Sequence, residues 1–424
     1  MNDSRTIVDQ EAAARRMGKR ELAAALQQCR TRTLALSAAY EAALGSTLHV
    51  PCTPELNPPI WELGHVGWFY DWWLARNPER FNGVRAQHDA PRLPARQASR
   101  GQDADALYNS SEVPHDSRWH LPLPDIDTTR EDLAQSLTDT LALLDGAPET
   151  DEGLYFFRLA LFHEDMHAEA AVYMAQNIGF DPGEHAPKTK DHRTPPSFEP
   201  LWIEAGECWL GYAGGDGFAF DNELSATLAP VDGFEIDRQP VTWAQFLPFV
   251  DSGAYAQRQF WTPEGWTWKA AIRATAPRYV RQGRSGDWER CVYGRWFPVD
   301  LSAPASHLTA FEAQAWCEWA GRRLPTEAEW MLATQQQQIQ HQRQDTAFVW
   351  GTEVWEWTSS PFAPFAGFEP HPYRDYSQPW FADGRPVLKG GSFATAPRMR
   401  HRAYRNYFTP ERNDIIAGFR SVAR

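Results

Sequence analysis

The chain has 424 residues, which is too long for one compact core, so two domains are expected. Its formal net charge of -14 argues against a nucleic-acid partner, because phosphate binding requires a basic face. The sequence contains no run of about 18 apolar residues, so no membrane span is predicted. The polar first ten residues do not resemble a signal peptide.

The five cysteines are odd in number, widely spaced and contain no C-x-x-C pair. This pattern argues against a disulfide framework or a thiolate zinc site, and it favours a reducing, cytoplasmic compartment. The aromatic fraction is 13%, with 20 tryptophans, which favours aromatic-rich packing or pockets that hold a cation or a ring.

The first predicted element is a long amphipathic helix over residues 9–44. Its apolar positions recur at the spacing of one buried helix face. Gly45 is predicted to end it, because a glycine accepts the left-handed conformation that follows a last turn. The buried positions are Leu22, Leu26, Cys29, Thr33, Leu36 and Tyr40.

A second helix is predicted over residues 60–75, after a proline-bearing connection, and it carries His65 among aromatic residues. The irregular segment that follows, residues 77–125, is rich in Pro, Arg, Asp and Ser. Irregular connections of this length within a compact domain are usually functional.

A third helix is predicted to begin with a capping box, Thr128 followed by Glu131. The fourth helix, over residues 152–177, contains His163 and His167, which one helical turn places on the same face. Four helices with one long connection predict a bundle, and bundles build metal sites from side chains on facing helices.

The histidine pair lies on an apolar stripe of the fourth helix. Buried imidazoles need partners, so the pair is either a hydrogen-bonded core pair or a pair of metal ligands. An inward-facing His65 on another helix would complete a three-ligand site with open positions, which favours the metal. The stripe consists of Phe156, Ala160, His163, His167, Ala170 and Met174.

The residue composition and the predicted element lengths change after the bundle. We expect a bundle at residues 1–180, a linker at 181–196, and a second domain at 197–424 with short strands and turns. Within that domain, helices are predicted over residues 309–320 and directly after Pro325. The polar, Gln-rich run Gln335–Gln344 is expected to lie at the surface.

Several segments of the second half resemble, in order, the formylglycine-generating-enzyme/sulfatase-modifying-factor domain, a variant of the C-type lectin fold. The stretch after G-G-S-F is A-T-A-P-R-M-R, without the cysteine pair of those enzymes, so their copper-dependent oxidase activity is not expected. The resemblance implies an α+β multidomain chain, and the fold alone does not supply a function. The matching segments are P-V-T-W-A-Q-F (240–246), W-A-G-R-R-L-P-T-E-A-E-W (319–330), V-W-E-W-T-S-S (354–360), L-K-G-G-S-F (388–393) and A-G-F-R (417–420).

Together with a DinB-like four-helix bundle, this domain makes nearly the whole chain resemble the sulfoxide synthases of ergothioneine and ovothiol biosynthesis. The resemblance implies a non-haem Fe(II) held by His65, His163 and His167. It also implies O2-dependent coupling of a chalcogen donor to C2 of the imidazole of hercynine, which is trimethylhistidine. We expect the active site at the interface of the two domains.

The resemblance also carries over individual site residues. It implies proton transfer by a tyrosine near the metal, for which Tyr373 is the candidate and Tyr376 the neighbour. Asn406 and Tyr407 match an element that contacts hercynine, where an aromatic ring could face the quaternary ammonium. Met166 replaces a glutamine of the family, so the hercynine contact from that side must differ.

The chalcogen donor that we expect follows from two places where the sequence departs from its relatives. Relatives that use γ-glutamylcysteine hold its carboxylates with arginines, whereas here Arg118 is the clearly placed one, with His115 nearby. The family's acidic position is Phe408, although Arg412 persists. This pattern is most similar to selenoneine synthases, which implies a selenosugar donor (1-seleno-N-acetylglucosamine) and C–Se bond formation.

Two alternatives stay open. One is an ergothioneine sulfoxide synthase that couples hercynine with cysteine or γ-glutamylcysteine. The other is a non-catalytic ligand-binding module with a structural zinc, because many lectin-fold domains bind ligands without chemistry.

Overall fold

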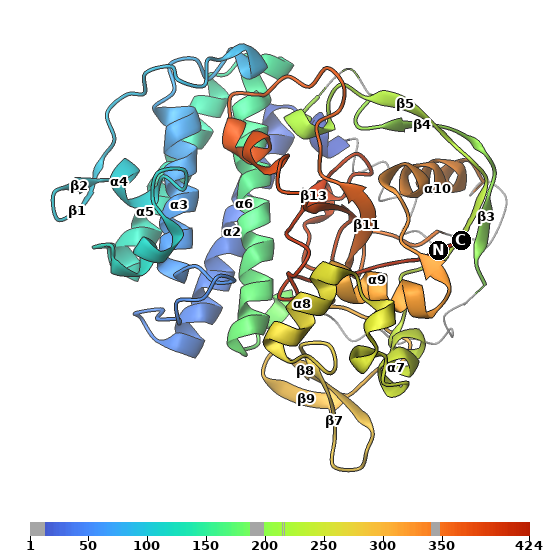
Figure 1. Cartoon of the computed structure of the whole chain (residues 1–424). Coiled ribbons are helices and arrows are strands. Elements are labelled where there is room, and N and C mark those ends of the chain that lie inside the picture. The colour runs from blue at the N-terminus through green and yellow to red at the C-terminus, as the bar shows by residue number, and fades with distance from the viewer. Residues whose placement is uncertain (1–12, 187–198, 214, 216, 341–347) are drawn as a thin grey trace.

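The computed structural model describes residues 13–186, 199–213, 215, 217–340 and 348–424. The N-terminal half is a bundle of long helices, and α6 is the member beside the C-terminal half (Figure 1). The predicted linker falls for the most part on residues 187–196, which lie outside the described ranges, so its boundaries stay a prediction. The bundle helices are α2 (Lys19–Leu44), α3 (Pro59–Tyr70), α5 (Ile126–Asp145) and α6 (Asp151–Ile178).

The helix starts depend on local capping. The prediction of one helix from residue 9 is wrong, because Gly18 has extended backbone (ψ 179°) and α2 begins only after it. The predicted capping box at Thr128 is also wrong. Asp125, a better cap that follows Pro124, accepts from the Thr128 N–H, so α5 begins at Ile126.

The bounds of α6 follow from its two ends. Thr150 accepts a hydrogen bond from the N–H of Gly153 at the start, and Gly179 has left-handed backbone (φ 94°) at the end. The helix predicted over residues 152–177 is therefore confirmed. The helix predicted over 60–75 is confirmed as α3, which continues into a π-helical turn, η1 (Asp71–Ala75).

The connection over residues 77–125 contains only short elements, as its composition indicated. Arg76 holds Asp105 through two hydrogen bonds of 2.7 and 2.8 Å, which fixes α4 against the bundle. The elements are η2 (Gly83–Arg85), β1 (Gln97–Ser99), β2 (Gln102–Asp103), α4 (Ala104–Tyr108) and η3 (His115–His120).

Among its described residues, the C-terminal half contains two four-stranded sheets. The first has the order β10-β15-β6-β3, and its neighbours are antiparallel. The second has the order β13-β12-β11-β14, in which β14 runs parallel to β11 and the other pairs are antiparallel. Their strands are β3 (Leu201–Ile203), β6 (Phe234–Ile236), β10 (Arg322–Arg323), β11 (Trp355–Pro361), β12 (Pro386–Gly390), β13 (Asn406–Tyr407), β14 (Ala417–Gly418) and β15 (Val422–Ala423).

Hairpins and helices surround these sheets. β4 (Gly206–Leu210) pairs with β5 (Thr227–Val231), and a three-stranded sheet projects from the molecule (Figure 1). The predicted helices at 309–320 and after Pro325 are confirmed as α9 and α10, whereas α7 and α8 were not predicted. Part of the Gln-rich run, residues 341–344, lies outside the described ranges. The remaining bounds are α7 (Trp243–Asp251), α8 (Pro263–Ile272), α9 (Ala310–Trp319), α10 (Glu327–Gln340), β7 (Val280–Gln282), β8 (Trp288–Val292) and β9 (Arg295–Pro298).

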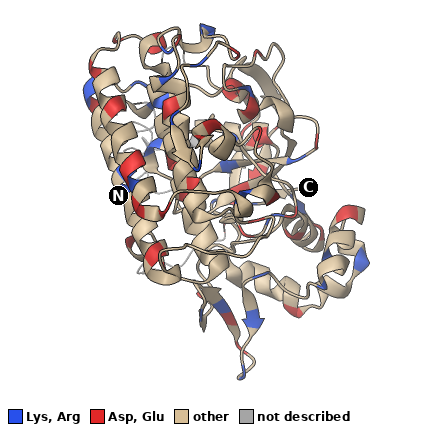
Figure 2. Cartoon of the chain, turned by 90° about the vertical axis from the view of Figure 1, so that its left-hand side faces the viewer, with Lys and Arg blue, Asp and Glu red and all other residues tan. Residues whose placement is uncertain are grey.

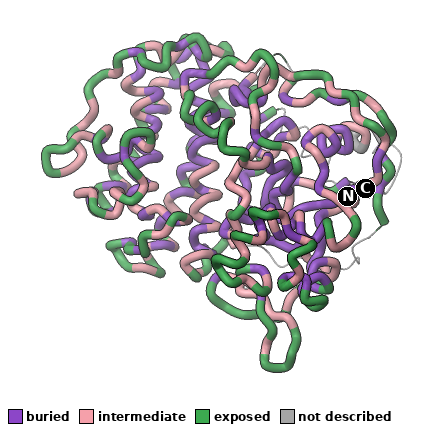
Figure 3. The backbone as a smooth tube through the Cα atoms, viewed as in Figure 1, coloured by how far each residue is buried: buried purple, intermediate pink, exposed green. Residues whose placement is uncertain are grey.

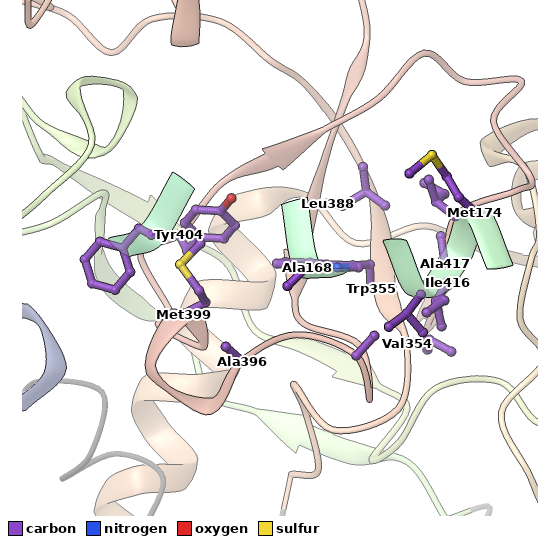
Figure 4. Packing of buried hydrophobic residues seen from close by; sticks show 14 of the residues in the cluster. Ala168, Met174, Val354, Trp355, Leu388, Ala396, Met399, Tyr404, Ile416 and Ala417 are labelled. Atoms are coloured by element: carbon purple, nitrogen blue, oxygen red, sulfur yellow. The ribbon is translucent and has the colours of Figure 1, made fainter. Parts of the chain in front are cut away.

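The two halves share a hydrophobic cluster, and α6 lies at the seam between them, while a second, smaller cluster lies within the C-terminal half. A single cluster of buried side chains extends from Leu22 in α2 to Phe419 near the C-terminus. Figure 4 shows Ala168 of α6 beside Trp355 of β11. Figure 3 shows the buried positions along the inner sides of the helices and through the centre of the C-terminal half. The predicted α+β architecture is therefore confirmed.

Polar contacts also join α6 to the C-terminal half. Arg398 donates two hydrogen bonds, of 2.6 and 2.9 Å, to the carboxylate of Asp165. Glu169 accepts from the indole N–H of Trp355 at 2.7 Å and from the hydroxyl of Ser392 at 2.6 Å. These contacts lie within one turn of His167, so they fix α6 where it carries the histidine pair.

None of the described helices has an apolar stretch long enough to span a bilayer. Acidic and basic residues are interspersed along the helices that face the viewer in Figure 2.

Candidate metal centre

Two bundle helices bring three histidines together. His163 and His167 stand one turn apart on α6, and His65 faces them from α3. The ring centroids are 4.5 Å apart within the α6 pair, and His65 lies 5.1 Å from His163 and 5.0 Å from His167. One nitrogen from each ring lies within 4.8 Å of the others. Within the described ranges, this is the one group of three His, Cys, Asp or Glu ligand atoms with that geometry.

Hydrogen-bond acceptors fix the tautomer of two of these rings. His65 Nδ1 lies 2.8 Å from the carbonyl oxygen of Tyr108, and His167 Nδ1 lies 2.5 Å from Glu62 Oε2. Because both partners accept, both Nδ1 atoms carry a proton, and a neutral ring in that tautomer keeps its lone pair on Nε2. His167 Nε2 is 3.2 Å from His163 Nε2, so the lone pairs converge on one region.

The third ring, His163, has no hydrogen-bond partner at its outer nitrogen and stacks on an aromatic side chain. His163 lies 3.5 Å from Phe69, with ring planes 6° apart, and its buried Nδ1 has no hydrogen-bond partner. Burial lowers the pKa of His163 well below its ordinary value, with His167 adding to the effect. Burial and His167 likewise lower the pKa of His65 to about 3. Both imidazoles are therefore neutral near pH 7, which is the state that binds metals.

The donor set fits a divalent transition metal. Imidazole ligands suit iron, copper, nickel or zinc, and three protein ligands leave open positions for substrates. The outer hydrogen bonds to Glu62 and Tyr108 are those that orient metal-bound histidines in proteins. The structure brings the three predicted ligands together, and their metal-binding role stays a proposal.

Tyr373 lies next to this cluster. Its ring is 6.3 Å from that of His163, and it packs against Phe69 at 5.2 Å and Trp73 at 5.8 Å. Burial raises the pKa of the Tyr373 hydroxyl, so it keeps its proton at neutral pH. The C-terminal half thus contributes a proton-bearing group beside the bundle's histidines.

Asp221 secures both ends of the segment that carries Tyr373. Its Oδ2 accepts from the His371 N–H at 3.3 Å, and its Oδ1 accepts from the hydroxyl of Ser377. His371 is further held by Tyr155 of α6, whose hydroxyl lies 2.9 Å from His371 Nδ1. The segment 371–377 is therefore pinned to both halves of the chain.

Met166 and Tyr376 meet on the same side of α6. The Tyr376 hydroxyl lies 3.8 Å from Met166 Sδ and donates to the Tyr404 hydroxyl at 3.2 Å. Its ring is 6.0 Å from that of Tyr373 and stacks on Phe220 at 4.5 Å. The structure therefore places Met166, Tyr373 and Tyr376 in one neighbourhood.

Asn406 and Tyr407 reach the same region through β13. The Tyr407 hydroxyl donates to the main-chain oxygen of Tyr376, and its ring stacks on Phe362 at 3.9 Å. Asn406 Oδ1 accepts from the Tyr407 N–H at 2.9 Å. Tyr407 therefore supports the segment 371–377 in this structure, and Asn406 is its neighbour in β13.

The predicted donor-binding residues are engaged within the protein. Arg412 holds Asp414 through two hydrogen bonds of 2.6 Å, and its guanidinium lies 5.0 Å from the Phe408 ring. Arg118 donates to Asn57 Oδ1 at 2.8 Å and stacks 3.9 Å over Trp61. The neighbouring His115 contacts the Leu56 oxygen through Nε2 at 2.9 Å. Each of these side chains is therefore held by other residues of the protein.

A pocket of about 460 Å³ opens beside the cluster, between the α3–η1 aromatics and the Tyr373 segment. Trp68 lines it 5.6 Å from the His65 ring, and Tyr373 lines it from the other side. Ser111 donates to Asp375 Oδ2 at 2.5 Å, which joins the bundle connection to the C-terminal half at this pocket. Its polar lining includes His88, Asn109, Ser110, Ser111, Glu112, Arg374, Asp375 and Gln378.

Sequence reasoning missed several residues that shape the site. Glu62 stands one turn before His65 on α3, but it bonds His167 on α6, so its spacing along α3 gave no signal. Tyr108 acts through its main-chain oxygen, so its side chain gave no signal. Asp221 lies 150 positions from the segment that it secures, and only the folded chain joins them.

Comparisons with known proteins decide the family. Residues 185–353 and 348–424 match the family model of the sulfatase-modifying factor enzyme 1-like domain. The chain is 31% identical to the hercynine oxygenase of Mycolicibacterium smegmatis, and the alignment covers 95% of this chain and 99% of that protein. The chain belongs to the hercynine oxygenase family. It is also 30% identical to the hercynine oxygenase of Mycobacterium tuberculosis over 94% of this chain and 98% of that protein.

A relative from Schizosaccharomyces pombe, named ergothioneine biosynthesis protein 1, is 24% identical over 84% of this chain and 50% of that protein. The expectation of a sulfoxide synthase of the ergothioneine type is thereby confirmed at the level of the hercynine oxygenase family. The expected sulfatase-modifying-factor domain in the C-terminal half is also confirmed.

Proposed function

We propose that this protein is a non-haem Fe(II) enzyme that uses O2 to join a selenosugar to C2 of the hercynine imidazole. The observation that carries the proposal is the convergence of three histidines, beside a protonated tyrosine, in a hercynine oxygenase family member. His65, His163 and His167 would hold the iron. When bound, iron supplies O2 activation and the electron transfers that C–Se coupling requires.

The overall reaction balances for a selenol donor. The C2–H bond of hercynine and the Se–H bond of the donor break, and one C–Se bond forms. One oxygen atom is transferred to selenium, which gives a selenoxide, and the other leaves as water. O2 therefore accepts four electrons, two from the coupling and two from the oxidation of selenium.

The chain's own residues supply positioning and a proton. Tyr373 keeps its proton at neutral pH and lies next to His163, so it would donate that proton to a group bound at the metal centre. Phe69 and Trp73 pack against Tyr373 and position its ring.

Hercynine would lie on the tyrosine side of the cluster. Its quaternary ammonium group has no N–H, so aromatic faces are its natural partners. Tyr376 and Tyr407 offer rings 6.1 Å apart there, and Asn406 offers an amide. Met166 provides a thioether where the family has a glutamine, so the imidazole contact from α6 would be less polar.

The pocket beside the cluster supports a sugar donor. It combines the faces of Trp68, Trp72 and Trp73 with hydroxyl, amide and carboxylate groups, and its volume lies within the about 300–1,000 Å³ of small-molecule sites. Indole faces pack against the C–H surface of a pyranose, and the polar groups can meet its hydroxyls. Arg118 and Arg412, which a carboxylate-bearing donor would need, are held by Asn57 and Asp414 instead.

One observation favours the thiol alternative. Arg374 lines the same pocket, is exposed, and pairs with no acidic side chain among the described residues. A free guanidinium could hold a carboxylate of cysteine or γ-glutamylcysteine. An ergothioneine sulfoxide synthase is therefore the second candidate.

A competition assay decides between the donors. Iron-loaded enzyme receives hercynine together with equal concentrations of 1-seleno-N-acetylglucosamine, cysteine and γ-glutamylcysteine, and mass spectrometry follows the products. We expect the C–Se product to form fastest. Preferential C–S coupling to either thiol would overturn the selenosugar assignment, and Arg374→Met would then raise the KM of that thiol.

A further inference from the structure

Glu62 makes two strong contacts on α3, one turn before His65. Its Oε2 accepts from His167 Nδ1 at 2.5 Å, and its Oε1 accepts from the Asn57 amide at 2.6 Å. The carboxylate therefore joins the helix that carries one proposed ligand to a second ligand on α6. Its side chain is only 12% exposed, so these partners replace most of its water.

The contacts continue outward from Asn57. Asn57 Oδ1 accepts from Arg118 Nη1 at 2.8 Å. Arg118 also donates to the Val113 oxygen at 3.3 Å and stacks 3.9 Å over Trp61, which fixes its position in η3. Arg118, Asn57, Glu62 and His167 thus form one hydrogen-bonded chain, which we call the relay.

The three proposed ligands differ in what holds their far nitrogen. His167 is held by a carboxylate, His65 by the neutral carbonyl of Tyr108, and His163 Nδ1 by nothing. A carboxylate partner raises the basicity of a ligating imidazole and fixes its ring, and a carbonyl does so less. His167 is therefore the ligand whose position and donor strength the protein controls most.

The surroundings of Glu62 explain why the relay continues to an arginine. An apolar cavity of about 40 Å³ adjoins Glu62 and His167, and it is lined by residues such as Leu36, Val66 and Met174. A carboxylate beside such a cavity needs its second oxygen satisfied and its charge balanced. Asn57 satisfies the oxygen, and Arg118 supplies the opposite charge through Asn57.

We propose that Glu62, Asn57 and Arg118 are positioning residues that set the metal affinity of the three-histidine centre through His167. In this proposal Arg118 acts on the metal ligand His167 through Asn57 and Glu62, and it does not hold the chalcogen donor. The inference deepens the proposed function and rests on it for the identity of the metal. Its test uses metal binding by the apoprotein, which needs no turnover.

The experiment titrates apoprotein with Co(II) and follows visible absorption, with a competing chelator to obtain Kd. Glu62→Gln keeps the shape but leaves an amide N–H facing His167 or Asn57, so we expect Co(II) binding about 10- to 100-fold weaker. Arg118→Met is expected to weaken Co(II) binding in the same direction and to shift the absorption bands, with partial recovery in Arg118→Lys. Glu131→Gln and Arg100→Met, exposed substitutions of the same type in α5 and in the connection, serve as matched controls with unchanged Kd.

The outcomes separate the relay from the metal centre. His167→Ala should lose Co(II) binding. If His167→Ala loses it while Glu62→Gln and Arg118→Met bind like the parent, the relay is wrong and the metal centre stands. If His167→Ala also binds like the parent, both are wrong. If Arg118→Met raises the KM of the chalcogen donor and leaves the Kd for Co(II) unchanged, Arg118 binds the donor and the relay is wrong. Circular dichroism checks folding, and Asn57→Ala tests the same link if Arg118→Met does not fold.

Discussion

At the scale of single residues, the site depends on imidazoles held in defined orientations. The three histidines and Tyr373 could be identified from helical spacing and from the family resemblance. Their outer partners could not, because Glu62 becomes a partner of His167 only when α3 packs on α6. Tyr108 contributes a main-chain carbonyl, which any residue type could supply.

Tyr373 is the residue whose substitution separates proton transfer from metal binding. Tyr373→Phe keeps the ring packed against Phe69 and Trp73 but removes the hydroxyl. We expect coupling to slow by about 100-fold or more, as for loss of a general acid, with unchanged iron content. Tyr376→Phe is the matched control. Steady-state O2 uptake measures both variants, and a Tyr373→Phe enzyme as fast as its parent would move the role to Tyr376 or to water.

At the scale of elements, α6 is held by a buried ion pair next to its first ligand. Arg30 of α2 donates hydrogen bonds of 2.8 and 3.1 Å to the Glu164 carboxylate, and the Thr33 hydroxyl donates to the same carboxylate at 2.7 Å. Both charged side chains are almost fully buried. The pair therefore fixes the rotation of α6 that turns His163 and His167 toward α3.

Breaking this pair should destabilise the bundle. Arg30→Ala leaves the Glu164 carboxylate buried without its charge partner, so we expect the free energy of unfolding to fall by about 3–5 kcal/mol. Chemical denaturation measures the change. The double variant Arg30→Met/Glu164→Met should recover much of the loss, because apolar side chains of similar volume replace a buried pair well. A single variant as stable as the parent would contradict the role of the pair.

Helix prediction succeeded where apolar periodicity was long and failed where local capping decided the outcome. The stripe of α6 spans many turns and gave its bounds within one residue at each end. Gly18 and Asp125 shifted the starts of α2 and α5, because backbone conformation and cap strength outweigh periodicity at a helix end. α7 is short and contains Pro248, so it gave no clear helical pattern.

At the scale of the whole molecule, the two halves are joined by one core and by ion pairs across the seam. The expectation that the halves meet at the histidines followed from family resemblance and not from the sequence pattern. The joining contacts, such as Arg398 with Asp165, link positions more than 200 residues apart. Composition and spacing carry no information about such pairs, so this level of the structure required the folded chain.

Buried histidines make the stability of the whole molecule pH-dependent. Burial, aided by the charge of Arg290, lowers the pKa of His307 to about 3, and burial lowers that of His371 to about 4. Between these values and the ordinary pKa of about 6.5, the unfolded chain binds protons that the folded chain does not. These groups therefore contribute full stability above pH about 7, and their contribution declines as the pH falls.

The His307 contribution can be isolated by substitution. For the apoprotein, we expect His307 to reduce the free energy of unfolding by about 2 kcal/mol on going from pH 7.5 to pH 5. His307→Gln can keep the hydrogen bond to the Asp414 oxygen but cannot titrate, so its stability should decline less over this range. Denaturant titrations at both pH values measure the difference. Identical declines in the two proteins would contradict the assignment.

The most direct test of the central claim is metal analysis combined with O2 uptake. Protein loaded anaerobically is analysed for bound metal and then mixed with O2, hercynine and a chalcogen donor. The proposed function predicts about one iron per chain, O2 consumption that depends on hercynine, and loss of both in His167→Ala. Zinc as the bound metal, with no O2 uptake when hercynine and donor are added, would contradict the enzymatic function and favour a ligand-binding module with a structural metal.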